Sequence, residues 1–267
     1  MFSSSRIKAV VLALLLISVG TLASITYATH SWSNYHWSHD SNSLTLSIGD
    51  NVTSQWDERL AQASNDWSQS AILDANIVTG ATNPKNCKAV AGRVEVCNSK
   101  YGNNGWLGIA SIWVSGSHIA KGTVKLNDTY FNAAKYNTVA WRNMVVCQEV
   151  GHTFGLNHQD EDFNNLNLGT CMDYTNDPTG TAGTNGALNN EHPNTHDYDE
   201  LALIYSHLDS ATTAPASRGA SAQTDVDTSN PSEWGKAIRK SSDGANSLYE
   251  RDLGKGHKIF TFVIWAK

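Results

Sequence analysis

The stretch CQEVGHTFGLNHQD, residues 147–160, carries the residue types of a metal centre at helical spacing. Residues four apart share one face of a helix, so Gln148 and His152 would project side by side. Glu149, three residues before His152, would lie close to the same face. A helix through this stretch therefore gathers an amide, a carboxylate and an imidazole at one point.

A glycine marks the expected end of that helix. Gly155 permits a left-handed turn, which can return His158 to the neighbourhood of His152 as a third ligand. Three protein ligands with an open fourth position are what a catalytic zinc ion needs. Glu149 would then act as general base and accept a proton from the water that attacks a polarised carbonyl.

This arrangement resembles the metzincin clan of metallopeptidases, whose helix motif H-E-x-x-H-x-x-G-x-x-H precedes a turn containing methionine. The matching residues are Glu149, His152, Gly155 and His158, followed by Cys171-Met172-Asp173-Tyr174 as the methionine turn. The resemblance implies a Zn²⁺-dependent endopeptidase that acts on protein or peptide substrates. It also implies that Met172 lies under the metal and that Tyr174 is a further ligand or stabilises the transition state.

Gln148 departs from the motif, because it stands where the clan has its first zinc-binding histidine. An amide oxygen is a weaker zinc donor than an imidazole nitrogen, although glutamine is long enough to reach the metal. One hypothesis is a secreted zinc endopeptidase with Gln148, His152 and His158 as ligands. The alternative is a catalytically inactive secreted binding protein on the same fold. Retention of Glu149 at the position of the base favours the peptidase.

The N-terminal residues predict secretion. Arg6 and Lys8 precede an apolar run that ends in small residues at Ala28, which is typical of a signal peptide over residues 1–28. A membrane anchor is the alternative, but the run is short for a span of about 20 apolar residues. Little chain then separates the cleavage site from the first strand, which favours an enzyme secreted ready to act.

The charge of the mature chain excludes some partners. Of 19 basic residues, two lie in the signal peptide, and the remaining 17 face 25 acidic residues for a net charge of about −8. Such a chain has no electrostatic reason to bind nucleic acid or an anionic membrane. We expect a monomer whose partner is its substrate.

Four cysteines suit an oxidising compartment and two disulfides. Three pairings are open, and nearness in sequence favours Cys87 with Cys97 and Cys147 with Cys171. The second pair would tie the motif helix to the segment that contains Met172.

The order of elements predicts an α+β domain over residues 44–209, and the resemblance implies a metzincin-like zincin fold with a twisted, mostly parallel sheet. Three helices are expected: an N-terminal helix over 54–70, the active-site helix from Thr138 and a C-terminal helix over 196–209. The first of these has one apolar stripe of Trp56, Leu60, Ala63 and Trp67. The strand over 118–127 is expected at the sheet edge, where a peptide can add as a further strand.

The remaining segments read as appendages. Residues 29–43 form an N-terminal tail, 210–232 a linker rich in small and polar residues, and 233–267 a C-terminal extension with a β-hairpin that packs on the main domain.

Several polar residues outside the motif are further metal candidates. His30, His36 and His39 are such candidates in the tail, although a solvated or edge segment is the expected role. Asp160-Glu161-Asp162 is a candidate calcium site, with a solvated loop as the alternative. Asp160 could also hold a ligand by a hydrogen bond.

Overall fold

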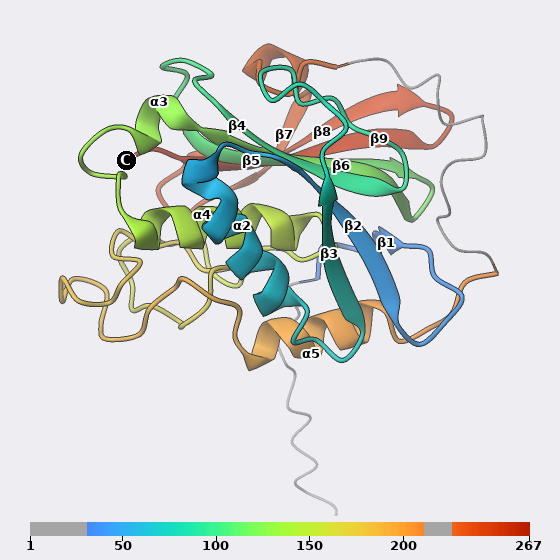
Figure 1. Ribbon diagram of the computed structural model, residues 1–267, viewed down its shortest axis with the longest axis horizontal. Coiled ribbons are helices and arrows are strands. Elements are labelled where there is room, and N and C mark those ends of the chain that lie inside the picture. The colour runs from blue at the N-terminus through green and yellow to red at the C-terminus, as the bar shows by residue number, and fades with distance from the viewer. Residues whose placement is uncertain (1–30, 211–225) are drawn as a thin grey trace, which may run out of the picture.

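The computed structural model describes residues 31–210 and 226–267, which build a nine-stranded mixed sheet with the three longest helices on one side (Figure 1). The α+β class predicted from the sequence is confirmed. The predicted signal peptide and most of the predicted linker fall outside the described residues. Among the helices that are described, none has the length and apolar content needed to cross a membrane.

The sheet has a parallel half and an antiparallel half, where a mostly parallel sheet was predicted. Its strand order is β3-β2-β4-β6-β5-β9-β8-β7, and β1 pairs with the start of β6. Strands β3, β2, β4 and β6 run parallel, whereas every pairing from β6 to β5 and onward is antiparallel. The strands are β1 (His36–Trp37), β2 (Leu44–Asn51), β3 (Leu73–Thr79), β4 (Arg93–Ser99), β5 (Trp106–Ser115), β6 (His118–Asn127), β7 (Lys236–Lys240), β8 (Asn246–Gly254) and β9 (His257–Trp265).

The helices are α2 (Ser54–Trp67), α3 (Asp128–Phe131), α4 (Val139–His152) and α5 (Thr195–Ile204), with a 3-10 turn over Pro231–Glu233. Helix α2 buries the apolar stripe predicted for it, and its four members are Trp56, Leu60, Ala63 and Trp67. Helix α4 begins at Thr138, whose side chain accepts a hydrogen bond from the backbone of Trp141. Since residues 140–152 are all buried, α4 lies inside the core between the sheet and α2 from its second residue onward.

Helix α4 ends as the sequence predicts. Gly155 has φ of +98°, and its backbone N–H donates to the carbonyl of His152. The carbonyl of Gly155 in turn accepts from Trp32. This left-handed turn directs residues 156–158 back under the end of the helix.

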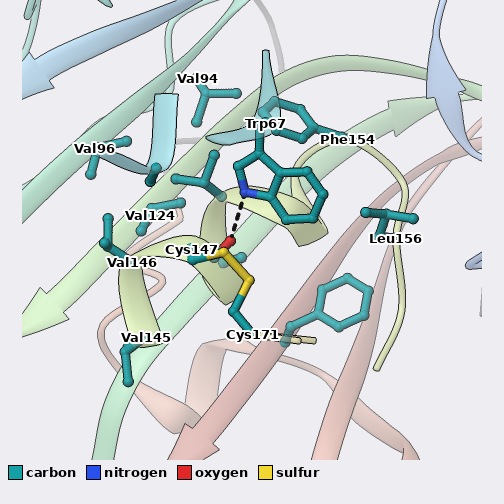
Figure 2. Close-up of a cluster of buried hydrophobic side chains, with 14 of the residues drawn as sticks. Trp67, Val94, Val96, Val124, Val145, Val146, Cys147, Phe154, Leu156 and Cys171 are labelled. Carbon is teal, nitrogen blue, oxygen red and sulfur yellow. Dashed lines mark hydrogen bonds between the residues drawn. A yellow bond between two sulfur atoms is a disulfide. The ribbon is translucent and has the colours of Figure 1, made fainter. Parts of the chain in front are cut away.

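A disulfide and a tryptophan fix the middle of α4 (Figure 2). Cys147 is bonded to Cys171, and the carbonyl of Cys147 accepts a 3.0 Å hydrogen bond from Trp67 Nε1 of α2. The other disulfide joins Cys87 and Cys97, so the predicted pairing is confirmed. The helix is therefore attached to α2 on one side and to the methionine turn on the other.

The C-terminal strands correct two expectations. Residues 236–265 form three strands of the main sheet, where a hairpin packed on the domain was predicted. The strand at 118–127 is also not an edge, because β6 lies between β4 and β5. Strand β5 would be the edge beside α4, but β9 pairs with it along nearly its whole length. The hairpin of β8 and β9 was predicted correctly, whereas β5, the other partner of β9 about 150 residues earlier, leaves no local signal.

The N-terminal tail is likewise part of the fold. Trp32 and Trp37 are buried, and Trp37 Nε1 donates a 2.7 Å hydrogen bond to the carbonyl of Thr153. The tail pairs with β6 through β1, so the edge-segment alternative describes it better than a solvated tail.

Gly151 is a point of close contact inside α4. A Cβ at this position would lie 2.6 Å from the Trp67 ring and 2.7 Å from Met172 Sδ. The absence of a side chain thus lets the methionine turn and α2 approach the helix together.

We predict that Gly151→Ala destabilises the protein by about 1–2 kcal/mol. Overpacking costs about 1–3 kcal/mol, and the better helix propensity of alanine recovers less than about 1 kcal/mol of it. Urea unfolding measures the change as a lower midpoint. Gly122→Ala is the matched control, because its Cβ would meet Val94 at an ordinary 3.4 Å. Equal midpoints for Gly151→Ala and wild type would contradict the packing described.

Candidate metal and active site

The two histidines of the motif converge. His152 Nε2 lies 2.9 Å from His158 Nε2, and both side chains are buried. His152 comes from the last turn of α4, and His158 returns to it because of the turn at Gly155. The structure therefore brings together the pair that helical spacing and the glycine predict.

The hydrogen bonds of the two Nδ1 atoms fix the tautomers of His152 and His158. His152 Nδ1 lies 2.9 Å from the carbonyl of Leu156, which can only accept, so this nitrogen carries the proton. His158 Nδ1 lies 2.9 Å from Glu161 Oε1, a carboxylate that also accepts. In the neutral rings both Nε2 atoms then present lone pairs to each other. A proton or a metal ion between them relieves that repulsion, and this is the tautomer in which histidine binds zinc through Nε2.

The separation of the two nitrogens suits a metal. Two nitrogens bonded to tetrahedral zinc at about 2.0–2.1 Å lie roughly 3.3 Å apart. The observed 2.9 Å requires an outward shift of a few tenths of an ångström.

Gln148 is oriented by the disulfide next to it. Its Nε2 donates a 2.8 Å hydrogen bond to the carbonyl of Cys171, the partner of Cys147. Since that carbonyl can only accept, the amide oxygen is the free end of the side chain. Gln148 Oε1 is buried and has no hydrogen-bond partner among the described residues. A buried acceptor without a partner costs about 1–3 kcal/mol, which a bound cation would offset.

Glu149 is buried on the β5 side of α4. Burial raises the pKa of Glu149 well above its usual value, and the backbone of Ala110 opposes this rise. Neither carboxyl oxygen has a partner of hydrogen-bond geometry within the described residues, so Ala110 acts only through proximity. Burial thus disfavours the charged form of this carboxyl group and shields it from water.

The methionine turn shows only part of what the resemblance implies. Met172 is buried and lies against α4 at Gly151. The ring of Tyr174 contacts His158 at a centroid distance of 4.4 Å, but its hydroxyl donates to the carbonyl of Val263 at 2.9 Å. Tyr174 is therefore engaged by β9 in this state.

Strand β9 covers the site. The ring of Phe262 stacks on the imidazole of His152, with centroids 4.1 Å apart and planes inclined by 9°. The next residue, Val263, accepts the hydrogen bond from Tyr174. Gln148, Glu149 and His152 have no measurable exposure to solvent. This burial does not fit the expectation of an enzyme secreted ready to act.

Glu161 is a site residue that sequence reasoning missed. The motif directed attention to Asp160, but its side chain accepts from the backbone of Asp162, two residues along the chain. Glu161 instead binds His158, accepts from Ser247 at 2.7 Å and lies 3.4 Å from Arg239. Burial opposes its ionisation, yet His158, Ser247 and Arg239 lower the pKa of Glu161. Its charge and its nearness to His158 in the sequence are the signal that could have directed attention to it.

The acidic run at 160–162 is not supported as a calcium site. Glu161 binds His158, whereas Asp160 and Asp162 each accept a backbone N–H two residues further along. Within the described residues, the grouping of three or more potential metal ligands lies elsewhere, at His36, His207 and Asp209.

Comparisons with known proteins give little. No protein-family model matches the chain, and no curated protein is similar to it in sequence. Among solved structures, the chain resembles high choriolytic enzyme 1, a hatching-enzyme zinc-protease from the medaka fish Oryzias latipes, with a TM-score of 0.36 and 11% identity. The match covers 66% of this chain and 96% of that one. A likeness this weak carries no argument.

We predict that Glu161→Gln weakens zinc binding by about 10–100-fold, the usual effect of losing a charged partner of a zinc-binding histidine. Glutamine keeps an acceptor for His158 Nδ1 but removes the negative charge that raises the basicity of the ring. Competition with a chelator measures the affinity. The matched control is Glu250→Gln, which removes a carboxylate of β8 that pairs with Lys258 of β9. This variant should leave zinc binding unchanged. Equal affinities in all three proteins would exclude His158 from the metal site.

Proposed function

We propose that this chain is a secreted zinc-dependent endopeptidase that its own strands β7–β9 keep latent. The observation that carries the proposal is the convergence of His152 and His158 through lone-pair nitrogens, one helical turn from Gln148, whose buried oxygen has no partner among the described residues. Two imidazoles and an amide oxygen make a neutral set of three donors. Zn²⁺ accepts nitrogen and oxygen ligands of this kind, and the residues present fit it.

The roles of the side chains follow from their positions. Gln148, His152 and His158 would hold zinc, which when bound supplies a Lewis acid for the carbonyl and the attacking water. Glu161 fixes the tautomer of His158, and the carbonyl of Leu156 fixes that of His152. Glu149, next to Gln148 on α4, would accept a proton from the attacking water and pass it to the leaving amine.

The substrate would enter where β9 now lies. Peptides commonly bind by adding a strand to a sheet edge, with backbone hydrogen bonds for affinity and side-chain pockets for selectivity. Without β9, the edge strand beside α4 would be β5. Residues 106–115 of β5 now pair with residues 257–265 of β9. Strand β9 thus has the backbone position of an antiparallel peptide, and Phe262 has the position of a side chain over the metal.

Latency accounts for the burial of an otherwise complete site. Displacement of β9 would free the edge of β5, remove Phe262 from His152 and release the hydroxyl of Tyr174. It would also admit water to Glu149 and favour its ionised form. Protein or peptide substrates follow from this geometry, since an extended backbone is what the edge accepts.

A second candidate function is favoured by the same burial. If β9 never leaves, the zinc site is structural and the chain is a secreted binding protein without catalytic activity. The two functions differ in what happens when the cover is weakened.

We predict that Phe262→Ala in the full chain, loaded with zinc, hydrolyses a denatured protein at least about tenfold faster than wild type. Removing a buried phenylalanine costs about 3–5 kcal/mol, and the part lost from β9 packing increases the open population. Ile238→Ala, which truncates an exposed side chain of β7, is the control and should match wild type. Adding Glu149→Gln to Phe262→Ala should abolish the activity. A zinc-loaded Phe262→Ala protein that cleaves none of several denatured substrates would favour the binding protein.

We predict further that a disulfide between β5 and β9 holds the enzyme inactive. Ser111 and Thr261 are paired across these strands, and their side-chain oxygens are 3.1 Å apart. In a Phe262→Ala background, Ser111→Cys with Thr261→Cys should be inactive when oxidised and active after mild reduction. Phe262→Ala alone, given the same reductant, controls for effects on the native disulfides. Full activity of the oxidised protein would show that β9 does not block the substrate.

A further inference from the structure

A second group of metal-binding side chains lies where the N-terminal segment meets the chain after α5. His36 lies in β1, and His207 and Asp209 follow the end of α5. One potential ligand atom from each of the three residues lies within 4.8 Å of the others. This group is separate from the motif on α4 in sequence and shares no residue with it.

The distances between these residues are close to those around a single small cation, with each histidine nearest a different oxygen of Asp209. His36 Nε2 is 3.1 Å from His207 Nε2 and 3.4 Å from Asp209 Oδ2, while His207 Nε2 is 3.7 Å from Asp209 Oδ1. Ligands bonded to tetrahedral zinc at about 2.0–2.2 Å lie roughly 3.3–3.6 Å apart. The three edges of the group span this value.

The tautomer of His36 also points to a cation. Its Nδ1 lies 2.8 Å from the carbonyl of Asn34, which can only accept, so Nδ1 carries the proton. In the neutral ring, Nε2 then presents a lone pair toward His207 and the carboxylate of Asp209. His36 is buried, so water screens this contact poorly.

Neighbouring groups hold Asp209 in place. The backbone N–H of His39 donates to Asp209 Oδ2 at 3.1 Å, and His118 Nε2 contacts Asp209 Oδ1 at 3.1 Å. Carboxylates that bind metals are commonly fixed by such outer partners. His39 adds a buried Nε2 that has no hydrogen-bond partner among the described residues, with its ring 6.2 Å from that of His207.

The group is accessible. A cavity of about 260 Å³ is lined by both histidines together with Ser31, Asn34, Glu200 and Ile204. The side chain of His207 is half exposed. An ion can therefore reach the group from solvent, and a fourth ligand such as water has room beside it.

We propose that the chain binds a second zinc ion through His36, His207 and Asp209, and that this ion clips the N-terminal segment to the end of α5. Two imidazoles select zinc over calcium, which prefers oxygen ligands. The clip would hold β1 against β6 and Trp32 against the turn at Gly155, which ends the motif helix.

The test is a count of zinc in the full chain, stripped of metal, reloaded and separated from unbound ions. Wild type should retain two equivalents and His207→Ala one, with an affinity at the second site lowered by at least about 100-fold, since losing an outer partner already costs about 10–100-fold. His192→Ala removes an equally exposed histidine paired with Asp66 and should retain two. In a thermal melt, zinc should raise the midpoint of His207→Ala by less than that of wild type.

Each outcome separates this site from the motif site. Equal zinc content in wild type and His207→Ala overturns the second site, whether one or two equivalents are bound. A wild type with one equivalent that His207→Ala loses supports the second site and counts against zinc at Gln148, His152 and His158. Asp209→Asn, which keeps an acceptor for the His39 amide, should lose the same equivalent. If Asp209→Asn keeps the second zinc equivalent, the assignment of Asp209 as a ligand is wrong.

Discussion

The attachment of α4 to the methionine turn is the constraint on which the candidate site depends. The Cys147–Cys171 disulfide sets the position of one carbonyl, and that carbonyl orients the amide of Gln148. Trp67 donates a hydrogen bond to the same turn of α4, and Gly151 leaves room for both Trp67 and Met172 against the helix. The amide of Gln148 carries no charge, so a hydrogen bond to Cys171 orients it. The disulfide and the contacts of Trp67 and Met172 hold that part of the structure in place.

The pairing of β9 with β5 then decides what the site can do. An unpaired strand edge beside a metal centre is open to an extended peptide, and the same edge is a hazard for unwanted association. In this protein β7–β9 satisfy the edge and place Phe262 over His152. The contacts that stabilise the fold are therefore the contacts that close the site, so stability and access are opposed at β9.

Local patterns predicted much of this structure. The stripe on α2, the start of α4 at Thr138, the turn at Gly155 and both disulfides depend on residues close in sequence, and each was correct. The convergence of His152 and His158 followed from the same local geometry. What could not be predicted is long-range: the partner of β9, the burial of the tail and the meeting of His36 with His207. Such contacts are chosen by packing of the whole chain, which one sequence without relatives does not reveal.

The most direct test of the account is anomalous X-ray scattering at the zinc edge from crystals of the zinc-loaded full chain. The account predicts a peak about 2.0–2.2 Å from His152 Nε2, from His158 Nε2 and from Gln148 Oε1, beneath Phe262. A fully occupied zinc ion elsewhere with none between these histidines, or one bound there with the amide oxygen of Gln148 turned away, would contradict it.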